Sequence, residues 1–285
     1  MLLQALGVMP AYLWDLLVRL WPLLLIIFGL AALVSRRTPT TVALLVIAVF
    51  ALVVVVFAAG YTRQALVVAD ANRQTIDVDL QDAGDIALTL DLSLTELTID
   101  AQEEATGRVT GEFSGSTENA LDVSYTRRGT QGDLRITEQN VNPIPLLEDF
   151  GSNRLTLHLP PEQPMTLDIN GNVGNITLDL SRVDVRPRLD VRASLGDVTV
   201  TLPDAGSLIG DIATGQGDVR VHIPASIPVV IKITRGVGGG LQIPTGFQQL
   251  ATGEWITEGF RMDEIRTNLN VGATFGDIVI AYISE

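Results

Sequence analysis

The chain has 285 residues, a net charge of −14 at pH 7, no cysteine and two histidines. The lack of cysteine excludes disulfides, thiol catalysis and cysteine-based zinc sites. The strong negative charge argues against a nucleic-acid partner and against tight binding to anionic lipid headgroups.

Apolar residues concentrate near the N-terminus. Residues 41–60 form a run of 20 residues without a charge. As a helix of about 30 Å this run would span a bilayer. Residues 12–34 predict an earlier span, entered through a turn that holds Asp15 and Arg19 at helical i,i+4 spacing. Together they predict a transmembrane hairpin over residues 1–60. A cleaved signal peptide is the alternative, but neither a basic start nor a small-residue cleavage site is present.

A short basic loop between these spans predicts the orientation. Arg36 and Arg37 lie in it, and basic loops favour the cytoplasm. This places both chain ends outside, although Arg19 and Arg63 beside the other span ends nearly balance the loop. We therefore expect a multi-pass cell-membrane protein whose β-domain is extracytoplasmic.

A linker is predicted over residues 61–73 and a domain of short strands over residues 74–285. Residues 61–285 hold 32 acidic and 16 basic side chains, as expected of a solvated acidic surface. Alternating apolar residues predict the first strands at 75–80, 86–92, 96–100, 108–113, 122–126 and 134–137. Residues 140–153 contain two prolines and an apolar cluster, and they predict a loop folded over the core, with a partner contact as the alternative.

A turn followed by an alternating strand recurs along this domain. At Gly196-Asp197 the glycine can adopt positive φ, the aspartate can bond nearby backbone, and an alternating Val/Thr strand follows. The predicted structural turns are Gly84-Asp85, Gly132-Asp133, Gly174-Asn175, Gly196-Asp197, Gly217-Asp218 and Gly276-Asp277. From Gly174 the steps are 22, 21 and 22 residues, the last reaching a looser copy at Gly239-Gly240. With a second strand about halfway through each step, this period predicts a β-solenoid with rungs about 4.8 Å apart.

Residues 244–264 interrupt the repeat and stretch its last step to 37 residues. They contain Phe247, Trp255 and Phe260, three of the few aromatic rings in the domain. Because a solenoid needs its open end covered, we expect a cap that packs these rings on the last coil. A site for a ligand or partner is the alternative.

Motifs for catalysis are missing from the sequence. It has no Gly-x-Ser-x-Gly elbow, no phosphate loop and no His-Glu-x-x-His pair. His158 and His222 occupy matching outward positions and predict surface histidines. A patch like that of polysaccharide-cleaving β-helices could be built from Asp179, Asp190, Asp211, Arg192 and Arg220. Outward strand positions are polar for solubility in any case, so we expect no catalytic, cofactor-binding or metal-binding residues.

Two features resemble a known family. The opening Leu20-Trp21-Pro22 with its apolar continuation resembles the membrane module of LiaF-like proteins, the bacterial cell-wall-active antibiotics response family. The Gly-Asp coils and the ending Gly253-Glu254-Trp255 then Gly276–Ile280 are similar to the toast-rack or putative-adhesin β-domain found with it. The resemblance implies a right-handed β-helix-like domain on a membrane hairpin, with a role in sensing or restraining envelope-stress signalling. Better-known members use more spans than two.

The sequence thus predicts a mainly β protein, a β-helix-like solenoid after a two-helix transmembrane hairpin. We expect a non-enzymatic, membrane-anchored regulator that needs no cofactor and binds a membrane sensor kinase or another envelope protein. The alternative is a structural or adhesin-like surface domain that self-associates through unpaired strand edges.

Overall fold

The computed structural model describes residues 72–103, 107–115, 119–140, 153–204, 207–260 and 267–283. The predicted hairpin over residues 1–60, with Arg36 and Arg37, lies outside these ranges, as do residues 141–152 of the predicted loop over 140–153. None of the described residues forms a helix long and apolar enough to cross a membrane. The described chain is built of strands, which confirms the mainly β prediction.

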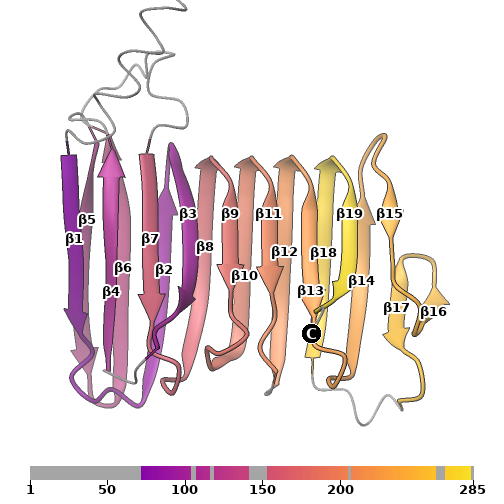
Figure 1. Cartoon of the computed structure of the whole chain (residues 1–285), viewed down its shortest axis with the longest axis horizontal. Coiled ribbons are helices and arrows are strands. Elements are labelled where there is room, and N and C mark those ends of the chain that lie inside the picture. The colour runs from indigo at the N-terminus through magenta and orange to yellow at the C-terminus, as the bar shows by residue number, and fades with distance from the viewer. Residues whose placement is uncertain are drawn as a thin grey trace, which may run out of the picture. The chain divides into compact units, whose positions relative to one another are not determined.

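The strands form two sheets that face each other (Figure 1). In spatial order the nine-stranded sheet contains β1 (Asn72–Asp79), β4 (Arg108–Gly115), β7 (Asn153–Leu159), β3 (Thr95–Ala101), β9 (Ile176–Asp179), β11 (Val198–Thr201), β13 (Val219–Ile223), β19 (Ile278–Tyr282) and β15 (Leu241–Gln242). The ten-stranded sheet contains β16 (Phe247–Ala251), β17 (Glu254–Thr257), β14 (Val229–Arg235), β18 (Thr267–Phe275), β12 (Leu208–Gln216), β10 (Val185–Leu195), β8 (Met165–Val173), β2 (Asp85–Leu92), β6 (Gln131–Asn140) and β5 (Asn119–Arg128).

Each regular rung contributes one strand to each sheet. Strand β10 turns at Gly196 into β11, and the next rung repeats the path from β12 through Gly217 to β13. Neighbouring rungs pair in parallel, with Val191 opposite Ile212 and Val200 opposite Val221. The rungs therefore stack as predicted from the period.

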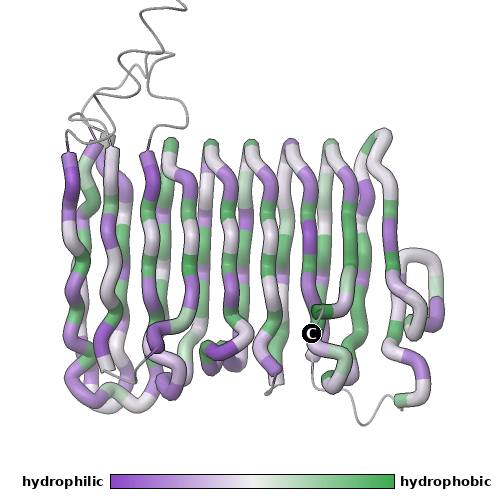
Figure 2. The backbone as a smooth tube through the Cα atoms, viewed as in Figure 1, coloured by the Kyte–Doolittle hydropathy of each residue, from purple (hydrophilic) through white to green (hydrophobic). Residues whose placement is uncertain are grey.

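The core lies between the sheets because apolar and polar residues alternate along each strand (Figure 2). In one rung Leu189 and Val191 of β10 and Val198 and Val200 of β11 are all fully buried. Complete burial of such a side chain stabilises the fold by about 1.5–3 kcal/mol. The rungs repeat this pattern, so the core runs the length of the stack.

The order of rungs in space differs from their order in the chain. The last strands, β18 and β19, lie between β12–β13 and β14–β15, as the yellow strands of Figure 1 show. A solenoid that keeps chain order would place the Gly239 rung directly beside the Gly217 rung, but β19 lies between β13 and β15. Strand β18 pairs with β12 through eight residue pairs and with β14 through seven, so the C-terminal rung is bonded on both sides.

The two ends of the stack differ in how open their strand edges are. At the first end the Gln74 side chain donates to the Leu121 carbonyl at 3.1 Å and accepts from the Leu121 N–H at 3.2 Å, joining β1 to β5. At the other end β15 has only two residues, and the register of β16 shifts between Gln249 and Ala251. Short and irregular edges discourage pairing with another chain. At the first end β1 and β5 remain end strands of eight and ten residues, so the predicted self-association through strand edges stays a prediction.

Candidate functional site

The turns that join the two sheets form one edge of the stack. Gly174, Gly196, Gly217 and Gly276 adopt φ between +139° and +146°, a region that other residues rarely enter. The turns also stack closely, since a Cβ at Gly196 would overlap the Gly174 carbonyl oxygen. These positions therefore need glycine for both conformation and space. We call this line of turns the turn edge.

Gly84-Asp85 and Gly132-Asp133 do not belong to the turn edge, which corrects their assignment as equivalent turns. Neither Gly84 nor Gly132 is among the glycines with positive φ. Gly132 lies within β6, opposite Ile86, and the Gly84 N–H donates to the Thr130 carbonyl at 2.6 Å. Both pairs lie where the β5–β6 hairpin meets β2. A Gly-Asp pair before an alternating strand therefore marks two different structures here.

The residues after the turn glycines form a ladder of side-chain hydrogen bonds. Asn175 Oδ1 accepts the Asp197 main-chain N–H at 3.0 Å, and Asp197 Oδ1 accepts that of Asp218 at 2.9 Å. Asp218 Oδ1 accepts the Asp277 N–H at 2.9 Å, and Asp277 Oδ1 accepts that of Gly240 at 2.7 Å. Each side chain thus binds the backbone of the next rung in space. The ladder follows the spatial order of the rungs, including the inserted one.

One arginine joins two carboxylates of this ladder. Arg220 lies 3.2 Å from Asp197 Oδ2 and 2.7 Å from Asp218 Oδ2. The main-chain hydrogen bond from Asp218 lowers the pKa of Asp197 most; partial burial raises it, and Arg220 lowers it further, so the net pKa is below the ordinary value. The Asp197 carboxylate is therefore ionised at neutral pH. Its charge lies on the surface of the turn edge.

Glu138 closes the turn edge at its first rung, and sequence reasoning missed it. Its carboxylate accepts the N–H groups of Ser93 at 2.6 Å and Leu94 at 3.0 Å and the Thr95 hydroxyl at 2.8 Å. The amide of Asn153 donates to its other oxygen at 2.9 Å. The available signal was alternation, because Leu134 and Ile136 place Glu138 on the buried face of β6.

The positions just before the turn glycines carry apolar side chains that face solvent. Leu195 is 45% exposed and Phe275 is 52% exposed, and Val237, at the equivalent position after β14, is 76% exposed. Val173 is half-buried in the same line, and Gln216 interrupts it. The register places them in adjacent rungs in the order Val173, Leu195, Gln216, Phe275 and Val237. We call these five residues the apolar row.

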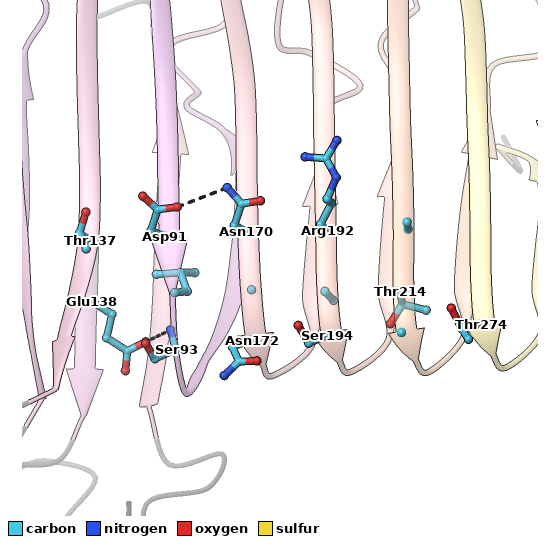
Figure 3. A pocket seen from close by; sticks show the side chains of 15 residues that line it. Asp91, Ser93, Thr137, Glu138, Asn170, Asn172, Arg192, Ser194, Thr214 and Thr274 are labelled. Carbon is cyan, nitrogen blue, oxygen red and sulfur yellow. Dashed lines mark hydrogen bonds between the residues drawn. The ribbon is translucent and has the colours of Figure 1, made fainter. Parts of the chain in front are cut away.

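A groove of about 730 Å³ runs beside this row on the outer face of the ten-stranded sheet (Figure 3). Its lining includes Asp91, Asn170 and Arg192, with Ser194 and Thr274 nearer the turns. The Asn170 amide donates to Asp91 Oδ1 at 3.3 Å. Small residues on successive strands, among them Gly171, Ala213 and Gly215, leave this face hollow, so the groove is open and shallow.

The predicted cap is a hairpin of β16 and β17 that extends the ten-stranded sheet beyond β14. The Phe247 ring stacks on Tyr282 with ring centroids 5.8 Å apart. Trp255 is half-buried and packs against the core. Phe260 is exposed, so only two of the three predicted rings pack inward.

The other candidate residues are dispersed or paired. His158 contacts the Asp100 carboxylate on β3, and His222 lies on β13, four strands away from His158 in the same sheet. Asp190 and Asp211 are neighbours on β10 and β12, while Asp179 lies on the other sheet. Within the described residues, no three acidic or histidine side chains are placed to hold a metal ion.

Two parallel-stacked sheets joined by glycine turns define a β-solenoid of the toast-rack class. Residues 67–222 match the family described as the N-terminal domain of toast_rack, and the chain belongs to that family. A crystal structure of a putative cell adhesion protein from Clostridium sporogenes ATCC 15579 is similar, with a TM-score of 0.67, 22% identity, and coverage of 74% of this chain and 99% of that one. A putative adhesin from Bacteroides fragilis NCTC 9343 also matches, with a TM-score of 0.29, 12% identity and coverage of 75% and 99%. None of the curated proteins compared with the chain matches it significantly in sequence.

Proposed function

We propose that this protein is a non-enzymatic, membrane-anchored regulator of the bacterial envelope that binds a protein partner through its turn edge. The partner is a membrane sensor kinase or another envelope protein. Support for the anchor comes from the uncharged run over residues 41–60, which is long enough to span a bilayer. Support for regulation comes from the resemblance of the opening segment to LiaF-like proteins.

The observation that carries partner binding is the apolar row. Of six large apolar side chains that are clearly exposed among the described residues, Leu195, Phe275 and Val237 lie in this row. Water contact of apolar side chains is unfavourable, and aligned exposed ones are typical of interaction surfaces. The turn glycines need no such neighbour for their own geometry. A partner that covers the row would remove this cost.

Photo-cross-linking in living cells tests this function. A photoreactive amino acid replaces Phe275 in the full chain, and the same residue replaces Ile209 as control. Ile209 is 53% exposed but lies on the outer face of the ten-stranded sheet. We expect a defined cross-linked membrane protein from position 275 and none from 209. Cross-links only between copies of the chain, together with altered cell adhesion, would favour the adhesin-like alternative.

Thiol labelling tests the anchor and its orientation. The chain has no cysteine, so Ser35→Cys and, separately, Ser284→Cys report their own surroundings. A membrane-impermeant thiol reagent on intact cells is expected to label position 284 and to spare position 35. The opposite pattern would invert the orientation. Recovery of the full chain in the soluble fraction would exclude the anchor.

A further inference from the structure

The chemistry of the partner follows from what lies on each side of the apolar row. Across each turn glycine the row faces the side-chain ladder, as in Leu195-Gly196-Asp197 and Phe275-Gly276-Asp277. The turn edge therefore carries two parallel lines, one apolar and one acidic. Both advance by one rung, about 4.8 Å, at each step.

The backbone of this edge is already bonded, which excludes one mode of recognition. The N–H of Gly174 donates to Leu195 O at 3.0 Å, that of Gly196 to Gln216 O at 2.8 Å and that of Gly217 to Phe275 O at 2.9 Å. An extended peptide adds to a sheet by pairing with free backbone groups. The turn edge offers none at these positions, so a partner must meet it with side chains.

An amphipathic helix is the element that presents a line of apolar side chains. The apolar row spans four rung steps, or roughly 19 Å. That length corresponds to about 13 helical residues at 1.5 Å each. A helix of three to four turns could thus cover the row from Val173 to Val237.

The acidic side chains of the turn edge favour a partner helix that carries basic side chains. Asp197, Asp218 and Asp277 line it, and Arg220 supplies one positive group. Residues 61–285, which contain the turn edge, hold 32 acidic and 16 basic side chains, a net of −16. Opposite charges across an interface favour encounter and register, and like charges oppose them.

Building on the proposed partner binding, we infer that the partner presents a cationic amphipathic helix whose apolar side packs on the apolar row and whose basic side chains face the ladder carboxylates. The helix N–H and C=O groups are bonded internally, so it needs no backbone partner from the edge. Anionic lipid is disfavoured by the same acidic line.

The probe is a synthetic 14-residue Leu/Lys amphipathic peptide with a fluorophore, and its matched control is the Leu/Glu peptide. Each is titrated by fluorescence polarisation against the full chain in nanodiscs of zwitterionic lipid, with empty nanodiscs subtracted. We expect binding of the Leu/Lys peptide and none of the Leu/Glu peptide. Equal binding of the two peptides would overturn the inference.

Variants separate the apolar line from the acidic one. The double variant Leu195→Ser with Phe275→Ser should weaken Leu/Lys binding at least about tenfold, whereas Ile209→Ser should not change it. The triple variant of Asp197, Asp218 and Asp277 to Asn should weaken binding and flatten its salt dependence. Asn175 already accepts an N–H in the ladder, so these asparagines preserve the fold. Binding that is insensitive to both variants would overturn the inference.

The cross-linking and peptide experiments distinguish failure of partner binding from failure of the cationic-helix inference. A cross-link from position 275 without Leu/Lys binding would show that a partner exists and that its chemistry is not a cationic helix. If position 275 gives no cross-link and the full chain does not bind the Leu/Lys peptide, the turn edge is not a binding surface and both proposals fall.

Discussion

The main-chain N–H of Asp218 donates a 2.9 Å hydrogen bond to Oδ1 of Asp197, which belongs to the preceding rung. Because the same bond recurs at each regular turn, side chains connect the backbones of successive rungs along the turn edge. The stack is therefore held by its sheets, by its core and by a separate ladder of polar side chains. This ladder gives the repeated geometry of the turns an energetic role that packing alone does not supply.

Replacing Asp218 tests the ladder. Asp218→Ala removes the acceptor for the Asp277 N–H and one of the two carboxylates that bind Arg220, and should cost about 1–3 kcal/mol. Asp218→Asn keeps an oxygen at the same place, as Asn175 does, and should cost less than Asp218→Ala. Urea denaturation followed by circular dichroism measures both. Equal losses would show that the hydrogen bond contributes nothing.

Acid should weaken the stack through Asp197. Its pKa in the fold lies below the ordinary 3.8, chiefly because of the hydrogen bond from Asp218. The stability from this shift is fully present above the unfolded pKa and is lost as pH falls through the folded pKa. Below about pH 4, the free energy of unfolding should therefore fall more steeply for the natural protein than for Asp197→Asn. Urea midpoints at pH 5, 4 and 3 measure the slopes, and parallel slopes would contradict the assignment.

Glycine should be required at the turns and replaceable in the strand. Gly196→Ala forces alanine into φ +145° and against the Gly174 carbonyl, so it should cost about 2 kcal/mol or more. Gly272→Ala is the matched control, because its nearest new contact would be at 3.6 Å. It should change stability by less than about 0.5 kcal/mol. Similar melting temperatures for the two variants would show that the turns tolerate a side chain.

Much of the fold could be predicted from the sequence because its signals are local. Alternation predicted the strands, and the Gly-Asp pairs before β11, β13 and β19 predicted the stacked turns. The same pairs misled at Gly84 and Gly132, since a hairpin also places glycine before an alternating strand. The identity of two adjacent residues does not determine the backbone φ angle of the glycine.

The order of the rungs could not be predicted, because it depends on contacts between distant segments. Gly239 follows Gly217 at the same spacing as the regular turns, yet β19 lies between them. The candidate site could be predicted only in part from the sequence, for the same reason. Asp197 and Asp218 were recognised as turn residues, but their bonds to the next rung and the alignment of Leu195 with Phe275 need the register of the strands.

Trp255 distinguishes a structural cap from a binding residue. Its ring packs against the core from β17, and its buried Nε1 has no hydrogen-bond acceptor among the described residues. Trp255→Phe removes this unsatisfied donor and keeps an aromatic ring, so the loss should stay within about 1 kcal/mol. Trp255→Ala removes the ring and should cost about 3 kcal/mol.

Thermal melting of the full chain and its two variants measures both effects. If Trp255 instead served a partner, both variants would melt like the natural protein and binding alone would suffer. The cap predicts the opposite order, with the alanine variant melting well below the phenylalanine variant. Because β17 pairs with β14 at the spatial end of the stack, this loss should appear as early melting of the rung that contains β14. Hydrogen exchange at Val230 and Ile231 would locate it there, while exchange at Val191 stays slow.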